Sequence, residues 1–371
     1  MVADPYPDLS RYRNFLILQH PLALGTAIHA TPLISVLRAA LPDARLIATA
    51  SGFSLGLLRG NPGLNELIRT PSPLSDLRGA VTAMRAARFF RGEPYAVLQT
   101  LGNGRTRITL AAMLSGGHVR AGFVVHPELA AAPLAFDPTR SQIANNLEIV
   151  RAMGHEDAMR AAIATDPMLA EPVVYPSQED FDRMEAKLAV EGISLAEPVA
   201  VFITQTSPTQ KKSWRAERFR LAASMLAREF GAQIVFGGTA AEAPSIELLR
   251  EGLNMRSANL AGKTSLLEMA ALFGLADVAL TLDTGPMHLA RAMRLPMVII
   301  APAWSPPVEW LPLGNPRARI LKNLDLEVAP EDYIIDEVSV DEVETALRDL
   351  LTLYPPRPGI SSRRIAEMAP R

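Results

Sequence analysis

Short apolar runs alternate with stretches of helical spacing along the first half of the chain. Residues 15–18 (FLIL) have the length of a buried strand, and apolar residues from Leu33 to Leu41 then recur three and four positions apart, as on one face of a helix. Thr31 and Pro32 suit the cap and first turn of that helix. The other elements expected in this half are strands at 46–48, 96–101 and 119–124 and a helix at 76–90.

The second half repeats this alternation. The elements expected there are strands at 199–203, 233–236, 278–282 and 297–300 and helices at 178–190, 216–230, 242–250, 266–275 and 341–351, with another helix opening near Gly285. Strands that alternate with helices form parallel sheets covered by helices on both faces. The pattern therefore predicts an α/β protein with two domains of similar size.

A stretch with four prolines, residues 155–198, separates the two halves. We accordingly expect an N-terminal domain at 1–170 and a C-terminal domain at 171–354. The remaining residues, 355–371, are rich in proline and arginine, and we expect them to be mobile or to lie over the surface.

The composition is that of an ordinary globular protein and excludes several kinds of site. Of 371 residues, 49% are hydrophobic and 20% charged, which is enough apolar material for two cores. The net charge of -2 argues against a general nucleic-acid binder. The absence of cysteine excludes disulfides and thiolate chemistry, and none of the six histidines forms an HxxxH or HExxH pair. We expect no metal site and no cofactor.

The N-terminal segment and the lengths of the apolar runs indicate where in the cell the protein is expected. The N-terminal segment lacks the apolar core of a signal peptide, and no run approaches the length of a membrane helix. We expect a cytoplasmic protein, with peripheral binding to the inner face of the cytoplasmic membrane as a further option. Arg85, Arg88 and Arg91 beside Phe89 and Phe90 would suit anionic lipid, although a solvated helix end is the favoured explanation.

The segment 280–300 carries the strongest chemical signal. A buried strand ends at Leu282 and is followed by Asp283, Thr284 and Gly285, and then by a helix that contains His288. A helix N-terminus after a strand presents free amides and a positive dipole end to an anion such as phosphate. Simple capping of a helix is the alternative.

Two further segments follow the same plan. Residues 203–219 join a strand to a helix through hydroxyl residues, among them Ser207, and two lysines, one of which is Lys212. A lysine among hydroxyl donors suits a diphosphate, and a solvated loop is the alternative. Residues 260–280 place Lys263 and Thr264 before a helix that opens with a Ser265–Glu268 capping box.

The first strand, loop and helix, residues 16–46, contain two histidines. His20 and His29 flank Gly25, which lies where we expect the loop to turn tightly. A structural role for each histidine is the alternative.

Taken in order, these segments resemble glycosyltransferase family 9, the ADP-heptose:lipopolysaccharide heptosyltransferases. The resemblance covers roughly residues 13–350. The matching residues are Gly25, Pro32, Pro42 and Ala44 in the opening segment; Lys212 and Trp214 in the middle one; Gly262, Lys263, Thr264, Ser265, Leu266 and Glu268 in the third; and Asp283, Thr284, Gly285, His288, Leu289 and Ala290 in the last.

The resemblance implies the GT-B fold, in which two Rossmann-like domains face each other across a cleft. The C-terminal domain would bind a nucleotide sugar, ADP-heptose by resemblance, and the N-terminal domain a glycan or glycolipid acceptor. Such enzymes invert the anomeric centre without a metal. The residues expected to bind the donor are Ser207, Lys212, Glu242, Lys263, Thr264, Asp283, Thr284, Gly285 and His288.

Individual roles can be assigned within this set. Lys212, Thr284 and Gly285 would meet the charge of the leaving group. Asp283 would contact hydroxyls of the donor sugar, and Glu242 would accept from the ribose. His288 would contact phosphate or brace its helix.

The sequence departs from the family at one position. The family has an aspartate, thought to be the general base, directly after the loop glycine, and this chain has Thr26 after Gly25. A threonine hydroxyl cannot act as a general base at neutral pH. His20 and His29 have a suitable pKa range and are the candidates to replace it.

Two alternative functions are kept, and Thr26 supports the first of them. One is a non-catalytic protein of the same fold that binds nucleotide sugars or serves as a scaffold. The other is a different reaction on the same fold, such as epimerisation of a sugar nucleotide, which would need acid and base carboxylates that the sequence does not reveal.

Overall fold

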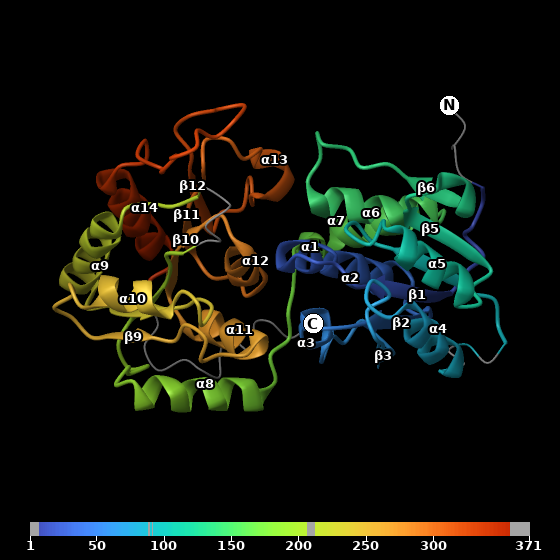
Figure 1. Ribbon diagram of the computed structural model, residues 1–371, viewed down its shortest axis with the longest axis horizontal. Coiled ribbons are helices and arrows are strands. Elements are labelled where there is room, and N and C mark those ends of the chain that lie inside the picture. The colour runs from blue at the N-terminus through green and yellow to red at the C-terminus, as the bar shows by residue number, and fades with distance from the viewer. Residues whose placement is uncertain (1–6, 88–89, 91, 206–211, 357–371) are drawn as a thin grey trace. The chain divides into compact units, whose positions relative to one another are not determined.

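The structure, a computed structural model, describes residues 7–87, 90, 92–205 and 212–356. The chain packs as two compact units, Met1–Tyr175 and Pro176–Arg371 (Figure 1). Each unit contains one six-stranded sheet with helices packed against it. The predicted α/β class is therefore confirmed. Only the first two residues of the expected C-terminal tail lie within the described residues.

The sheet of the first unit is entirely parallel, in the order β3-β2-β1-β4-β5-β6. Its strands are β1 (Asn14–Gln19), β2 (Arg45–Ala50), β3 (Glu66–Arg69), β4 (Ala96–Gln99), β5 (Val119–Phe123) and β6 (Ala132–Leu134). The chain builds outward from β1 to β3 and then returns to place β4 on the other side of β1. The strand order therefore reverses between β1 and β4, where open α/β sheets bind ligands.

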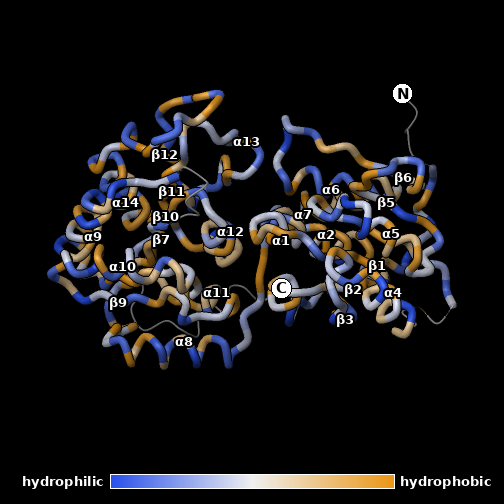
Figure 2. Tube along the Cα trace, viewed as in Figure 1, coloured by the Kyte–Doolittle hydropathy of each residue, from blue (hydrophilic) through white to orange (hydrophobic). Residues whose placement is uncertain are grey.

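Helices cover both faces of this sheet. They are α1 (Leu24–His29), α2 (Thr31–Ala40), α3 (Phe53–Leu58), α4 (Leu77–Ala86), α5 (Thr106–Leu114), α6 (Gln142–Ala152) and α7 (Glu156–Thr165). Phe15 and Ile17 of β1 share a core with α2 and α6, and the alternate residues Leu16 and Leu18 share one with α4 and α5. Because both faces are covered, the strand is apolar nearly throughout, as Figure 2 shows.

The sheet of the second unit is also parallel and repeats this topology, in the order β12-β11-β10-β7-β8-β9. Its strands are β7 (Val199–Ile203), β8 (Gln233–Phe236), β9 (Ser257–Asn259), β10 (Val278–Leu282), β11 (Met297–Ile300) and β12 (Ala318–Leu321). Its strand order reverses between β7 and β10.

The helices of the second unit also lie on both faces. They are α8 (Gln178–Val190), α9 (Ala216–Phe230), α10 (Ala243–Arg250), α11 (Leu266–Leu275), α12 (Gly285–Ala292), α13 (Pro307–Trp310) and α14 (Val340–Leu353). Phe202 of β7 packs in one core with Phe219 of α9 and Leu347 of α14. Helix α11 contacts α8 and α12.

Two expectations about the first strand–loop–helix segment are wrong. Gly25 lies inside the short helix α1 and has no positive φ, because the chain turns earlier, between His20 and Ala23. Thr31 is the first residue of α2, after the N-cap Ala30, and does not cap it. Its hydroxyl instead donates to the Ile28 carbonyl at 2.8 Å and accepts from the Val173 amide at 3.1 Å.

Several expected elements are longer than the structure shows. The helix expected to reach Phe90 ends at Ala86, and the strand expected to reach Leu101 ends at Gln99. In contrast, β7, β8, β10, β11, α8, α9 and α11 have the bounds that the sequence predicts.

Candidate functional site

The strand-order reversal of the second unit carries an ion pair. Lys212 follows β7 and Asp283 follows β10, and these two strands are neighbours in the sheet. Lys212 Nζ lies 2.8 Å from Asp283 Oδ2 and donates to the Asp283 carbonyl at 3.1 Å. The two side chains are 13% and 3% exposed. The structure therefore brings together two residues that the sequence assigned to the donor site.

Helix α12 starts directly beside this pair. Thr284 occupies its N-cap position, but no side chain caps the helix, and the Thr284 hydroxyl is directed to the Leu282 carbonyl at 3.4 Å. The first amides of a helix have no partner within the helix itself. Pro286 has no N–H, and the Met287 amide donates to the Thr284 carbonyl at 3.1 Å. The amides that this helix start offers to an anion beside the Lys212 ammonium are therefore those of Thr284 and Gly285.

His288 lies on the same helix and is buried. Burial lowers the pKa of His288 to about 4, the Asp283 carboxylate opposes this, and the nearby cations Arg291 and Lys212 add to it. The imidazole is therefore neutral at neutral pH. Its ring centroid is 5.8 Å from that of Trp310, so packing is one role it already has.

The loop that follows β11 borders the ion pair. Its Trp304 ring lies with its centroid 5.3 Å from Lys212 Nζ, within the range of a cation–π contact. Ser305 is buried and donates to Asp283 Oδ2 at 3.3 Å. The sequence reasoning missed both residues, although their position just after a strand of a parallel sheet was a usable signal.

The strands β8 and β9 lie on the side of β7 away from β10, and the loops that follow them contact each other. The Gly262 amide donates to the Gly238 carbonyl at 2.9 Å, and Gly262 has a φ of +73°. Glu242 lies in the first of these loops as the N-cap residue of α10. Its Oε2 accepts from the Thr239 amide at 2.7 Å, so this carboxylate is held at the carboxyl end of β8.

Lys263 and Thr264 lie between β9 and α11. The Lys263 ammonium is exposed and 2.5 Å from Glu191, at the end of α8. The Ser265–Glu268 capping box expected for α11 is present, and Glu268 also accepts from Lys187 at 2.9 Å. Ser207, another residue expected to bind the donor, lies outside the described residues.

In the first unit, a histidine at the strand-order reversal connects the loops after β1, β2 and β4. His20 follows β1, and its backbone amide donates to Asn103 Oδ1 at 2.8 Å, from the loop after β4. Its Nδ1 is 2.9 Å from the Ser51 hydroxyl, which follows β2. Burial lowers the pKa of His20 to about 4, so this imidazole is also neutral at neutral pH.

Thr26 and His29 lie close to this bridge, on α1. The Thr26 methyl group packs against Gly102, where a Cβ would come within 2.5 Å of it. His29 is buried at the end of α1, and its carbonyl accepts from Asn146 at 3.2 Å. Ser51 and Asn103 are polar residues that the sequence reasoning missed, and both follow strands of the sheet.

Two further kinds of site can be assessed from residues 7–87, 90, 92–205 and 212–356. Within those ranges, no three His, Asp or Glu side chains gather in a group that could hold a metal ion. No helix in the described part of the chain has the length and apolarity needed to cross a membrane.

Comparison with known sequences places these residues in context. Residues 157–333 match the sequence model of glycosyltransferase family 9 (heptosyltransferase). The chain is 28% identical over 173 residues to lipooligosaccharide heptosyltransferase 2 of Haemophilus influenzae, a match that covers 42% of this chain and 49% of that protein. It is 26% identical over 117 residues to the lipopolysaccharide core heptosyltransferase OpsX of the same organism. The chain therefore spans half or less of the length of these curated relatives.

Solved structures extend the likeness over nearly the whole chain. A glycosyl transferase family 9 protein from Veillonella parvula superimposes with a TM-score of 0.79 at 20% identity, covering 94% of this chain and 98% of that one. The E. coli ADP-heptose lps heptosyltransferase II gives 0.73 at 22% identity, covering 92% and 99%. E. coli heptosyltransferase WaaC with ADP gives 0.66 at 16% identity, covering 91% and 99%. At these identities the likeness establishes the fold, which is GT-B as predicted.

Proposed function

The chain belongs to glycosyltransferase family 9, and we propose that it transfers heptose from ADP-heptose to a lipopolysaccharide-type acceptor, with inversion and without a metal. One observation carries the proposal: the Lys212–Asp283 pair lies where the strand order reverses, beside the N-terminus of α12. That position suits a diphosphate, because an ammonium and free backbone amides converge there.

Each donor group has a part in this proposal. Lys212 and the amides around Thr284 and Gly285 neutralise the charge that develops on the departing ADP. Asp283 accepts from hydroxyls of the heptose, since a carboxylate would repel the diphosphate itself. Glu242 accepts from the ribose.

The remaining predicted donor residues contribute in other ways. His288, neutral at pH 7, donates a single hydrogen bond to phosphate or supports α12 through Trp310. Ser207, Lys263 and Thr264 complete the predicted set, and the Lys263 ammonium would have to exchange its contact with Glu191 for the donor.

His20 is the better of the two candidates for the missing base. Its Nδ1 contacts the hydroxyl of Ser51, a half-buried residue, whereas His20 itself is 2% exposed. Ser51 would therefore meet the acceptor hydroxyl and pass its proton to His20. Burial lowers the pKa of His20 to about 4, so its imidazole is neutral at neutral pH and has a lone pair that can accept the proton.

The proposed step is a single displacement. The acceptor oxygen forms a bond to the anomeric carbon on the face opposite the diphosphate, while the anomeric C–O bond to phosphate breaks and its electron pair leaves with ADP. The acceptor proton moves through Ser51 to His20 Nδ1. Inversion follows because only one displacement takes place.

Thermal stabilisation tests the donor assignment. Among ADP-, GDP-, UDP- and dTDP-sugars without metal, ADP-heptose should raise the melting temperature most, since a ligand at one hundred times its Kd stabilises by about 2.7 kcal/mol. The Lys212→Ala variant should lose this response. Stabilisation by another nucleotide sugar alone would contradict the choice of donor, and no response to any would contradict the donor site.

Thr26 gives some support to the alternative of a non-catalytic binder, because the usual base is missing. The two functions separate in a transfer assay with deacylated lipopolysaccharide core as acceptor. Binding of ADP-heptose with neither transfer nor slow hydrolysis would favour the binder.

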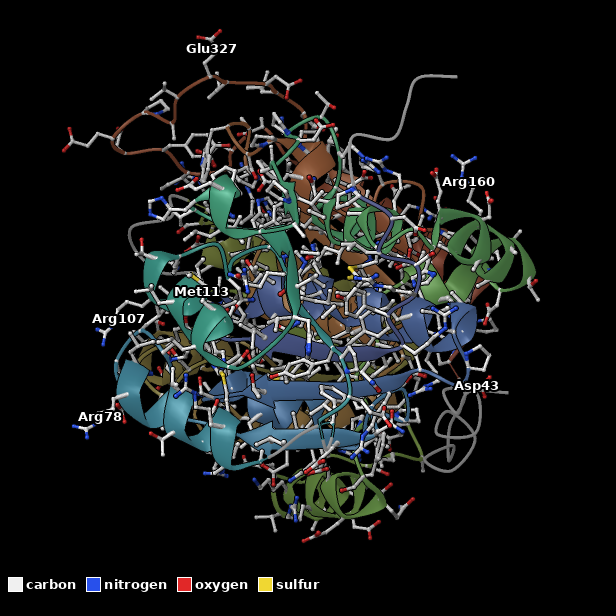
Figure 3. The ribbon with its side chains drawn as sticks, turned by 90° about the vertical axis from the view of Figure 1, so that its right-hand side faces the viewer. Asp43, Arg78, Arg107, Met113, Arg160 and Glu327 are labelled. Carbon is white, nitrogen blue, oxygen red and sulfur yellow. The ribbon has the colours of Figure 1, made fainter. Side chains whose placement is uncertain are left out.

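A lipid-linked acceptor would bring the protein to a bilayer, and the first unit has a surface that suits one. Helices α4 and α5, which contact each other, carry the arginines Arg78, Arg85 and Arg107 and no acidic residue. Figure 3 shows Arg78 on α4 and Arg107 on α5 pointing outward on one side, and Leu110 and Leu114 of α5 are exposed. We propose that this surface binds anionic phospholipid through its arginines and inserts the leucines.

Vesicle sedimentation tests this surface. Phosphatidylglycerol vesicles should bind the protein and phosphatidylcholine vesicles should not. Arg78→Glu/Arg107→Glu should weaken binding by at least about thirty-fold, because two arginines worth ~1 kcal/mol each are lost and two repelling carboxylates are added. Equal binding of the variant would contradict the proposal. Of the basic cluster expected from the sequence, Arg88, Phe89 and Arg91 lie outside the described residues.

A further inference from the structure

The loop after β11 presents a large aromatic ring next to the charged pair. Trp304 is half-buried, and its ring faces the Lys212 ammonium at 5.3 Å. A partly exposed tryptophan beside a polar cluster offers a flat apolar surface that the other residues of the site lack. Such a surface suits a ligand that has both apolar C–H groups and hydroxyls.

The ring is held in place by its neighbours in the chain. The Ala303 amide donates to the Tyr333 hydroxyl at 2.8 Å, and the Ala303 carbonyl accepts from Lys322 Nζ at 2.9 Å. On the other side of the ring, Ser305 is anchored to Asp283. The Ala303 backbone and the Ser305 side chain are therefore held on the two sides of Trp304, which keeps this part of the loop beside the Lys212–Asp283 pair.

The strand order indicates which part of a nucleotide sugar would lie over this ring. Along the sheet the order is β11-β10-β7-β8. Glu242, the proposed ribose contact, follows β8, and the proposed diphosphate site lies over β7 and β10. A donor laid along this line therefore has its sugar over the end of β11, where Trp304 lies.

We propose that Trp304 forms the platform for the sugar ring of the donor, a deepening that rests on the function proposed above. The pyranose packs a face of C–H groups on the indole, while its hydroxyls reach Asp283 and Ser305 at the edge of the ring. The Lys212 ammonium, which lies 5.3 Å from the centroid of the indole, turns to the diphosphate. That exchange is favourable because the several charge-assisted hydrogen bonds that phosphate oxygens accept are together stronger than one cation–π contact.

The comparison of ADP-heptose with ADP tests the platform. Calorimetric titration of Trp304→Ala should show ADP-heptose weakened by about ten-fold, the scale of one aromatic contact, with ADP unchanged. Trp304→Phe should recover most of the loss. Leu313→Ala, an exposed change in the following segment, is the matched control and should bind both ligands like the unaltered protein.

Each other outcome contradicts the platform. Equal weakening of ADP and ADP-heptose would mean that Trp304 stacks on the base or only positions Lys212. Unchanged binding of both, or ADP-heptose binding no tighter than ADP in the unaltered protein, would mean that the ring contributes nothing to sugar binding. Failure of the unaltered protein to bind ADP at all would instead contradict the proposed donor site.

Fluorescence gives a second readout that does not depend on the stability of an alanine variant. With Trp214 and Trp310 changed to phenylalanine, Trp304 is the only tryptophan of the chain. ADP-heptose should change its emission more than ADP does, since only the former covers the ring with sugar. An identical response to both ligands would contradict the platform.

Discussion

Lys212 and Asp283 are 71 residues apart in the sequence, yet their side chains meet at 2.8 Å across the boundary between β7 and β10. Both are largely buried, so the pair is shielded from solvent. The ammonium is therefore held beside the proposed diphosphate site by the Asp283 carboxylate and the Trp304 ring, and only has to turn from them to the diphosphate when the donor binds. This preorganisation reduces the cost of ordering a flexible lysine when the ligand binds.

Substitutions at the pair should affect the nucleotide and the sugar differently. Lys212→Ala removes a charge-assisted hydrogen bond of about 1.5–3 kcal/mol, so ADP and ADP-heptose should both bind roughly ten- to one-hundred-fold more weakly. Asp283→Asn should weaken ADP-heptose alone, because the carboxylate contacts sugar and not phosphate. Calorimetric titration of both ligands measures this, and weaker ADP binding in Asp283→Asn would contradict the division of roles.

The proposed base predicts a loss of turnover without loss of binding. His20→Gln and Ser51→Ala should each lower kcat by about 10²–10⁴-fold, the usual contribution of general base catalysis, while the Kd for ADP-heptose stays unchanged. Ser51→Thr keeps the hydroxyl and should retain most of the activity. Single-turnover kinetics separate chemistry from binding, and a larger loss in His29→Gln than in His20→Gln would transfer the role to His29.

Most strands and helices of the second unit could be predicted because their apolar runs have the length and spacing of buried elements. The seven elements whose bounds match, such as α9 and β10, are long or uniformly apolar. The short helix α1 was missed because six residues carry too little periodicity to distinguish a helix from a loop. Its N-cap residue, Ala23, also has no side-chain oxygen, so the sequence lacks the capping signal that usually marks the start of a helix.

The site residues that have a local sequence signal could be predicted, and the contacts between them could not. Asp283 and Lys212 were found because their local segments look like ligand loops, whereas their mutual contact depends on strand order, which the sequence does not reveal. Ser51 and Trp304 stand in segments without a motif. Only the two sheets show that Ser51 follows β2, the neighbour of β1, and that Trp304 follows β11, the neighbour of β10. A search for polar and aromatic residues just after each predicted strand would have included both.

The two buried histidines predict a loss of stability in mild acid. Burial lowers the pKa of His20 and of His288 to about 4, below the ordinary value of 6.5, so the unfolded chain binds protons that the folded protein does not. Their contribution is complete above pH 6.5 and declines as the pH falls towards 4. Between pH 7 and 5 each histidine should cost about 2 kcal/mol of the unfolding free energy.

Urea unfolding at pH 7 and pH 5 measures this decline. His288→Gln and His20→Gln replace the titrating group, so each variant should show a smaller difference between the two pH values than the unaltered protein. An unchanged difference in both variants would mean that other groups cause the acid sensitivity.

Gly262 should tolerate no side chain, for two separable reasons. Its φ of +73° costs an alanine about 1–2 kcal/mol, and an added Cβ would lie 2.6 Å from the Ala240 backbone, which cannot rotate away. Gly231 has a similar φ of +65° but has nothing within 4 Å of an added Cβ, so Gly231→Ala isolates the conformational cost. Gly262→Ala should be the more destabilising variant in urea unfolding.

Gly262→Ala should also weaken ADP binding, because the contact between the loops after β8 and β9 holds Glu242 in place. Gly231→Ala should leave ADP binding unchanged. Equal losses of stability in the two variants would show that the loops can separate without cost, and Glu242 would then need another support.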